Sequence, residues 1–171
     1  MKKPIGIFDS GIGGLTVLKE IMQTLPHEDT IYFGDTARVP YGAKSPDTVI
    51  RYSLENARFL LKFDIKALVV ACNTASAYAL SRLSAEIPVP VIGVIMSGAK
   101  KAVSVTKNKK IGIIGTDGTI KSRVYLNAIK AIDPDVSVFS KSCPLFVPLA
   151  EEGWIDNDVA FLTANKYLSE L

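Results

Sequence analysis

Cys72, Asn73 and Thr74 follow a short apolar run, Ala67–Ala71, and form the sharpest chemical signal in the sequence. At a switch from strand to helix, backbone N–H groups and the helix dipole lower the pKa of a thiol from its reference value of about 8.5. A free cysteine is more often a small buried hydrophobe, but this placement favours a reactive thiolate. Papain-type hydrolysis needs a histidine beside the cysteine, and the single histidine, His27, falls near the end of the first predicted helix. Proton transfer by the thiolate needs no such partner.

Polar residues also follow other predicted strands, at the positions where open parallel sheets bind ligands. Helix N-termini there offer unpaired N–H groups and a positive dipole end. The residues are Asp9 and Ser10, Tyr41 and Gly42, and Thr116 with Thr119. N–H and hydroxyl donors suit a carboxylate, and the Asp9 carboxylate suits an ammonium, so the set predicts a small zwitterion as the ligand. A nucleotide is the competing interpretation.

The glycine loop at residues 11–16 can be tested against the dinucleotide-binding fingerprint. Thr16 stands where the third glycine of that fingerprint is required. Asp9, just before the loop, would repel a pyrophosphate, and no Gly-Lys-Ser/Thr follows, so a P-loop is not indicated either. The alternative is structural, because glycines also allow a strand to turn tightly into a helix.

Composition excludes several classes of protein. The chain has 171 residues, 48% hydrophobic and 22% charged, with a net charge of +3, which is typical of an α/β domain and not of a disordered or fibrous chain. The charge balance is too even to require nucleic acid. No apolar run approaches the roughly 18 to 20 residues of a membrane span, and no signal peptide is evident, so a cytoplasmic location is expected. Two cysteines, Cys72 and Cys143, and one histidine predict neither a disulfide framework nor a metal site.

The elements that must position these residues alternate between short apolar runs and segments of helical period, which predicts a mostly parallel α/β fold. Ser45 is predicted to be a helix N-cap, with Pro46 at the first helical position. Strands are expected at 5–8, 31–33, 67–71, 90–95, 111–114 and 136–139, and helices at 15–23, 46–63, 75–83, 121–129 and 157–171, with a further helix before Lys107.

The segment beginning at Ile111 repeats the strand, polar glycine turn and helix that begin at Ile5. This echo predicts two related α/β domains, 1–95 and 96–171. A further strand is expected after the last helix, and none follows, so the second domain is expected to be incomplete.

Five motifs together resemble the glutamate racemase family of the aspartate/glutamate racemase superfamily, in order and in spacing. They are Asp-Ser-Gly-Ile-Gly-Gly-Leu-Thr-Val from 9, Phe-Gly-Asp-Thr-Ala-Arg-Val-Pro-Tyr-Gly from 33, Ala-Cys-Asn-Thr-Ala-Ser-Ala from 71, Gly-Thr-Asp-Gly-Thr-Ile from 115 and Pro-Leu-Phe-Val-Pro-Leu-Ala-Glu from 144. The resemblance implies two three-layer domains with mostly parallel sheets and the active site in the cleft between them.

The same resemblance implies interconversion of L- and D-glutamate without cofactor or metal. One thiolate removes the α-proton, and a thiol on the opposite face returns one. Cys72 would be the first of these, with Asp9 beside it. Ser10, Tyr41, Gly42, Asn73 and Thr74 would bind the substrate's carboxylate and amino groups, with Thr116 and Thr119 reaching it from the second domain. The D-glutamate product would serve peptidoglycan synthesis, and family members commonly form homodimers.

The sequence departs from the family at its second base. The family carries this cysteine in a Gly-Cys-Thr-His segment, which residues 1–171 do not contain. Cys143, followed by Pro144, is not a replacement. Glu151 is the better match for the acid that pairs with the family's histidine, and Glu152 is the alternative. An intact racemase is therefore expected to be longer.

Three other interpretations stay open. The chain could be a fragment that binds glutamate, or exchanges the α-proton of one enantiomer, without completing inversion. Its activity could instead resemble that of aspartate or hydantoin racemases. A nucleotide-binding α/β domain rests on fold class alone, and the missing third glycine counts against it.

Overall fold

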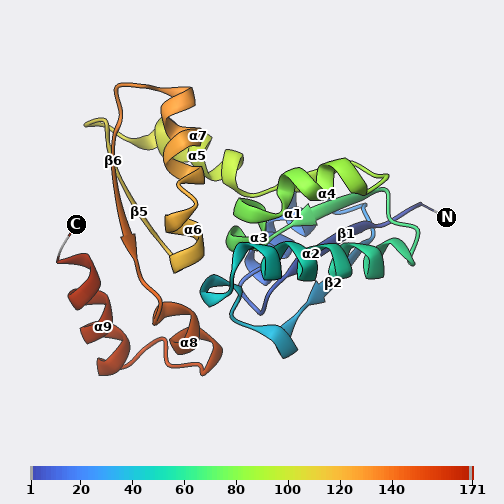
Figure 1. The fold of residues 1–171 in the computed structure, drawn as a ribbon, viewed down its shortest axis with the longest axis horizontal. Helices are drawn as coiled ribbons and strands as arrows, with labels where there is room; N and C mark the ends of the chain where they lie inside the picture. Colours follow the sequence, from blue (N-terminus) through green and yellow to red (C-terminus); the bar gives the residue numbers. More distant parts are fainter. Residues whose placement is uncertain (1, 170) are drawn as a thin grey trace. The chain divides into compact units, whose positions relative to one another are not determined.

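The computed structural model describes residues 2–169 and 171, which form two compact units, 1–94 and 95–171 (Figure 1). Both units combine helices with a parallel sheet. The predicted α/β class is therefore confirmed. Each unit is described by itself below.

Unit 1 is built on a four-stranded parallel sheet in the order β2-β1-β3-β4. The strands are β1 (Ile5–Asp9), β2 (Thr30–Gly34), β3 (Ala67–Val70) and β4 (Val91–Gly93). Because all four strands run in the same direction, the residues that follow them lie at one edge of the sheet. Asp9, Asp35 and the Ala71-Cys72 pair are at or just beyond that edge.

Helices and two short 3₁₀ turns connect these strands. They are α1 (Leu15–Thr24), η1 (Thr36–Arg38), η2 (Tyr41–Ala43), α2 (Pro46–Leu61), α3 (Asn73–Tyr78) and α4 (Leu80–Glu86). Ser45 caps α2 as predicted, since its hydroxyl accepts a bond from the Thr48 N–H at 3.3 Å. The single helix predicted at 75–83 is wrong. Buried Ala79 ends α3 and begins α4, although backbone bonds continue on both sides of it.

The core of unit 1 lies on both faces of the sheet, because alternate strand residues point to opposite faces. On one face Phe8, Leu68 and Val70 pack in a cluster with residues of α2, α3 and α4. On the other, Ile7 and Val69 pack with the apolar side of α1. The sheet is therefore the middle of three layers, and its carboxyl edge is held by helices on both sides.

Unit 2 contains a two-stranded parallel sheet, β5 (Lys110–Gly115) and β6 (Ser137–Ser142). Its helices are α5 (Ile95–Val105), α6 (Asp117–Lys121), α7 (Val124–Ile132), α8 (Phe146–Glu151) and α9 (Asp158–Leu168). A buried cluster that includes Ile95, Ile113, Ile129 and Val136 joins α5, α7 and the two strands.

Two predicted helices of unit 2 differ from the structure. The helix predicted at 121–129 is α7, which begins later and ends at Ile132. Lys121 instead ends α6, because Arg123 between the two helices has a left-handed backbone conformation, with a φ of 56°. The helix predicted at 157–171 is α9, capped by the Asn157 side chain and ending at Leu168. Residue 170 of that prediction lies outside the described residues.

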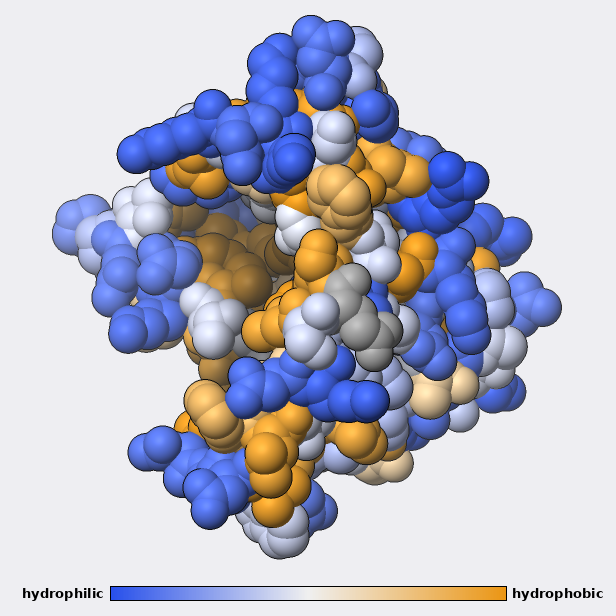
Figure 2. Space-filling view, turned by 90° about the vertical axis from the view of Figure 1, so that its left-hand side faces the viewer, coloured by the Kyte–Doolittle hydropathy of each residue, from blue (hydrophilic) through white to orange (hydrophobic). Residues whose placement is uncertain are grey.

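Hydrophobic side chains lie on the surface of unit 2. Figure 2 shows them in orange among hydrophilic residues, on the face turned toward the viewer. In α9, Phe161 is 67% exposed and Leu162 is 64% exposed. Among the described residues, no helix has the length and hydrophobicity needed to cross a membrane.

Candidate active site around Cys72

Cys72 lies where β3 turns into α3 and is the N-cap of that helix. It is 5% exposed. Its thiol donates to the Ser10 hydroxyl at 3.4 Å, and the Ala75 N–H donates to its sulfur at 3.4 Å. The predicted strand-to-helix position is confirmed, and it brings the thiol next to the loop that follows β1.

The predicted lowering of the Cys72 pKa is wrong. Burial, followed by the negative charge of Asp9, raises the pKa of the Cys72 thiol to about 11. Hydrogen bonds from Ser10 and Ala75 act in the opposite direction but are weaker. The local sequence pattern shows the helix start but not the burial, and only the family resemblance led us to expect the Asp9 carboxylate beside the thiol. At pH 8 the thiolate fraction is on the order of one in a thousand.

Asp9 ends β1 and is buried. One of its carboxylate oxygens, Oδ2, accepts bonds from the Gly11 N–H at 3.2 Å and the Gly14 N–H at 2.8 Å. The carboxylate thus holds the glycine loop closed while its charge acts on Cys72. Asp9 has both a structural and an electrostatic role.

The glycine loop is shaped by close packing. A Cβ on Gly14 would lie 2.5 Å from the Asp9 Cβ and 2.9 Å from the Tyr32 hydroxyl oxygen, which leaves no room for a side chain. That tyrosine hydroxyl donates to the Gly11 carbonyl at 3.0 Å. Gly14 has a helical backbone, with a φ of −65°, so it is required here by this close approach, which fixes the backbone around Asp9.

The Tyr41–Gly42 turn forms η2 and packs against α3, the helix that Cys72 caps. Both residues are buried, and the Tyr41 ring belongs to the same apolar cluster as Cys72. Asn73 and Thr74 form the first turn of α3; the former is exposed and the latter buried. The unit thus gathers Ser10, the η2 turn and the first turn of α3 around one thiol.

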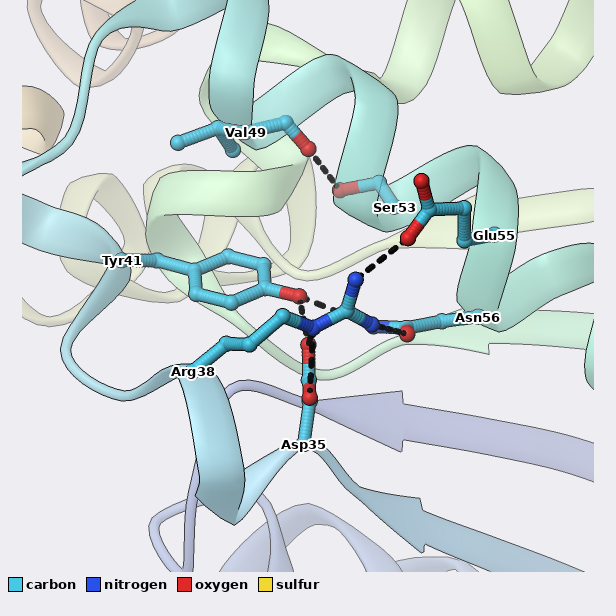
Figure 3. Close-up of polar contacts among 7 residues, drawn as sticks. All are labelled: Asp35, Arg38, Tyr41, Val49, Ser53, Glu55 and Asn56. Carbon is cyan, nitrogen blue, oxygen red and sulfur yellow. Dashed lines mark hydrogen bonds and ion pairs between the residues drawn. The ribbon is translucent and has the colours of Figure 1, made fainter.

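Three polar residues near this turn were missed as functional candidates by the sequence reasoning. The Tyr41 hydroxyl donates to Asp35 and accepts from the Asn56 amide, and Arg38 donates to the side chains of both (Figure 3). The first two belong to the motif quoted around Tyr41, and Asp35 follows β2 as directly as Asp9 ends β1. This shared position at the end of a strand could have identified Asp35 as a candidate from the sequence. Nothing in the sequence could have shown that Asn56, in the middle of α2, faces the same turn.

His27 lies in the turn between α1 and β2, just before the amino end of a strand. Cys72 follows the carboxyl end of β3, and the two strands are parallel in one sheet. The residues therefore lie at opposite edges of the sheet, which agrees with the prediction that they form no catalytic pair.

In unit 2, Thr116 and Thr119 lie together at the start of α6. Thr116 caps the helix by accepting a bond from the Thr119 N–H at 3.3 Å, and the two hydroxyl oxygens are 3.1 Å apart. Asp117 accepts a bond from the Ser142 hydroxyl of β6. The hydroxyl pair follows β5 as predicted, within unit 2.

Cys143 directly follows β6 and is 2% exposed. Its sulfur lies 3.7 Å from the Lys141 carbonyl oxygen, and burial raises the pKa of its thiol. Glu151 ends α8 and is half-buried, whereas Glu152 is exposed. The contacts of Cys143, Glu151 and Glu152 do not indicate a catalytic role.

Comparison with known proteins gives a consistent result. The sequence model of the Asp/Glu/Hydantoin racemase family matches residues 5–154. A glutamate racemase of Geobacter metallireducens is 66% identical over 169 residues, which cover 99% of this chain and 63% of that protein. The chain thus spans less than two thirds of that relative's length.

Solved structures agree with this comparison. The crystal structure of a glutamate racemase isoform from Bacillus anthracis has a TM-score of 0.94 and 43% identity, covering 98% of this chain and 63% of that one. A second, from Francisella tularensis and in complex with D-glutamate, has a TM-score of 0.90 and 43% identity, with the same coverage.

Proposed function

This chain belongs to the Asp/Glu/Hydantoin racemase family, and on that premise we propose that it carries the first proton-transfer group of a glutamate racemase. The reaction is the interconversion of L- and D-glutamate without a cofactor. The observation that carries the proposal is the position of Cys72, which caps α3 beside Ser10 and within the field of Asp9. The named glutamate racemases among the similar proteins support glutamate as the substrate.

The proposed step is removal of the substrate's α-proton by the Cys72 thiolate. The proton moves to Sγ, and the electron pair of the C–H bond stays on the substrate as a planar carbanion. A proton delivered to the opposite face then gives the other enantiomer. Because an amino acid's α-proton is weakly acidic, binding and charge stabilisation must lower the barrier.

Substrate binding would itself activate the thiol. Burial and, after it, the Asp9 charge raise the Cys72 pKa, and the substrate's ammonium would bring a positive charge next to that carboxylate. The two charges would offset each other and lower the thiol pKa when the substrate is present. The enzyme would then hold an unreactive thiol at rest and a more reactive one in the complex.

The remaining predicted residues would hold the substrate. Ser10 contacts the thiol, Gly42 lies in the turn that packs against α3, and Asn73 and Thr74 begin that helix. Their hydroxyl, amide and N–H groups suit the two polar groups at Cα. Thr116 and Thr119 supply paired hydroxyls in unit 2 and are proposed as further substrate contacts. Glu151 is proposed as the acidic partner of a histidine.

The family resemblance also underlies the proposed biological role, location and oligomeric state. The product would supply D-glutamate for peptidoglycan, the enzyme would act in the cytoplasm, and it would form a homodimer. The second thiol is proposed to lie in a Gly-Cys-Thr-His segment, which the 171 residues do not include. Residues 1–171 by themselves are therefore expected to exchange the α-proton of one enantiomer.

The test is loss of the α-proton NMR signal in heavy water, measured separately for L- and D-glutamate and L- and D-aspartate. We expect residues 1–171 to incorporate deuterium into one enantiomer of glutamate, at least tenfold faster than into either aspartate. Faster exchange of an aspartate would overturn the substrate assignment. Binding of glutamate by calorimetry without any exchange would support a binding module instead of an enzyme.

A further inference from the structure

The buried polar cluster of Asp35, Arg38, Tyr41 and Asn56 has no assigned role in proton transfer. We propose that Asp35, Arg38 and Asn56 are positioning residues, which hold the Tyr41–Gly42 turn in the orientation that receives the substrate. Tyr41 then acts through this cluster, and its hydroxyl does not contact glutamate. The inference rests on the proposed function, because it concerns the same substrate site.

The Tyr41 hydroxyl is fully engaged within the protein. It donates to Asp35 and accepts from the Asn56 amide at 3.0 Å (Figure 3). The Tyr41 residue is 1% exposed, Asp35 is 5% exposed and Asn56 is 1% exposed. A hydroxyl held in this way has both its proton and an acceptor position occupied at a buried site. Tyr41 is expected to bind substrate, and with its hydroxyl occupied, the backbone of its turn is the better candidate for that contact.

Arg38 joins the three other members into one network. Its Nε donates to the Asp35 carboxylate at 2.9 Å, and an NH₂ group donates to the Asn56 side-chain oxygen at 2.8 Å. A second NH₂ group pairs with the more exposed Glu55. Its guanidinium carbon lies 4.2 Å from the centre of the Tyr52 ring. The network therefore ties the loop after β2 to the middle of α2 at several points.

Tyr41 and Arg38 both stay protonated in this network. Burial and the Asp35 carboxylate raise the pKa of Tyr41 far above its usual value, so the hydroxyl remains a donor. For Arg38, partial burial disfavours the charged form, but bonds to Asp35 and Glu55 outweigh it and raise its pKa. Neither group changes its charge near neutral pH, so the turn is held by a constant set of bonds.

The network connects to the thiol through packed elements. The η2 turn packs against α3, and α2 also packs against α3. The Tyr41 ring and Cys72 belong to one buried cluster. A loss of bonds around Tyr41 would therefore shift the turn relative to the helix that Cys72 caps, and the distance between substrate carboxylate and thiol would change with it.

The test is a double-mutant cycle on the deuterium-exchange reaction, using Tyr41→Phe and Asp35→Asn. Each single change is expected to raise the KM for glutamate by about tenfold and to lower kcat by less than about threefold. The double variant is expected to have a KM about tenfold above that of the wild type, the same as each single variant and not about a hundredfold above it, because both changes break the same network. Additive effects would show that the hydroxyl contacts glutamate independently, and would overturn the inference.

Ser53→Ala is the matched control. Ser53 is fully buried on α2 and donates to its own helix at Val49, outside the network (Figure 3). It is expected to lower the melting temperature but to change KM by less than about twofold. Asn56→Ala is a milder second variant, which leaves the Tyr41 bond to Asp35 in place and is expected to raise KM by at least about threefold. Near-UV circular dichroism verifies that each variant is folded.

The outcomes separate this inference from the proposed function. Deuterium exchange by the wild-type chain with unchanged KM in the folded Asp35→Asn and Asn56→Ala variants would overturn the positioning role alone. A Ser53→Ala variant with the same increase in KM would also overturn it, since any loss of α2 stability would then have this effect. No exchange by the wild-type chain would overturn the proposed function and this inference together.

Discussion

Two features of Cys72 shift the pKa of its thiol in opposite directions. As the N-cap of α3 it accepts a backbone N–H bond, which favours the thiolate. Burial and Asp9 favour the thiol more strongly, and they raise its pKa to about 11. The local sequence pattern around Cys72 indicates only the first feature, and the family resemblance adds the proximity of Asp9 but not the burial. The second needs the fold, because Asp9 and Cys72 are 63 positions apart and meet only when β1 and β3 pair.

Asp9→Asn is expected to move the pH profile of Cys72 alkylation to lower pH. The change removes the negative charge, yet the amide oxygen can still accept the bond from Gly14. In the wild-type protein, the rate of reaction with iodoacetamide should rise with pH up to about 11, as the thiolate forms. The measurement is the rate at each pH, with mass spectrometry of the Cys72 peptide. A midpoint that stays unchanged or rises would contradict the electrostatic role of Asp9.

In the loop between β1 and α1, the closest packing is at Gly14. Gly14 lies against Asp9 and Tyr32 so closely that a methyl group would collide with both. Gly13 is less constrained, because the nearest atom to its added Cβ would be the Asp9 Oδ2 at 3.7 Å, an ordinary contact. There is therefore room for an alanine side chain at position 13 but not at position 14.

Gly14→Ala is expected to lower the free energy of unfolding by about 1 to 3 kcal/mol, because the backbone around Asp9 must shift. It should also raise the KM for glutamate exchange, since that carboxylate moves with the loop. Gly13→Ala is the control, and we expect a change of less than about 1 kcal/mol. Urea unfolding of both variants gives the comparison. An equal loss at the two positions would show that the close approach at Gly14 has no special cost.

Much of the fold could be predicted because the local signals agree with it. Ser45 followed by Pro46 marks the start of α2, and each apolar run predicted as a strand overlaps one. The errors fall where one residue interrupts a helical pattern. Ala79 and Arg123 have no sequence feature that distinguishes them from helix interior residues, so these interruptions depend on the folded chain.

Across the whole chain, the predicted site residues fall in both units. Unit 1 brings Asp9, Ser10 and the η2 turn to Cys72, and unit 2 brings Thr116 and Thr119 together. The resemblance could identify these residues, since each lies in a motif. It did not identify the network around Tyr41, because the partners come from a loop and a distant helix turn, and their meeting is a property of tertiary structure.

The most direct test of the account compares the two thiols of the chain in the deuterium-exchange reaction. Cys72→Ala is expected to reduce deuterium incorporation into glutamate to the background rate, because it removes the group that takes the α-proton. Cys143→Ala should keep at least about a third of the wild-type rate, once a matching melting curve shows that it is folded. Exchange that persists in Cys72→Ala, or is lost in folded Cys143→Ala, would contradict the assignment of Cys72 as the proton-transfer group.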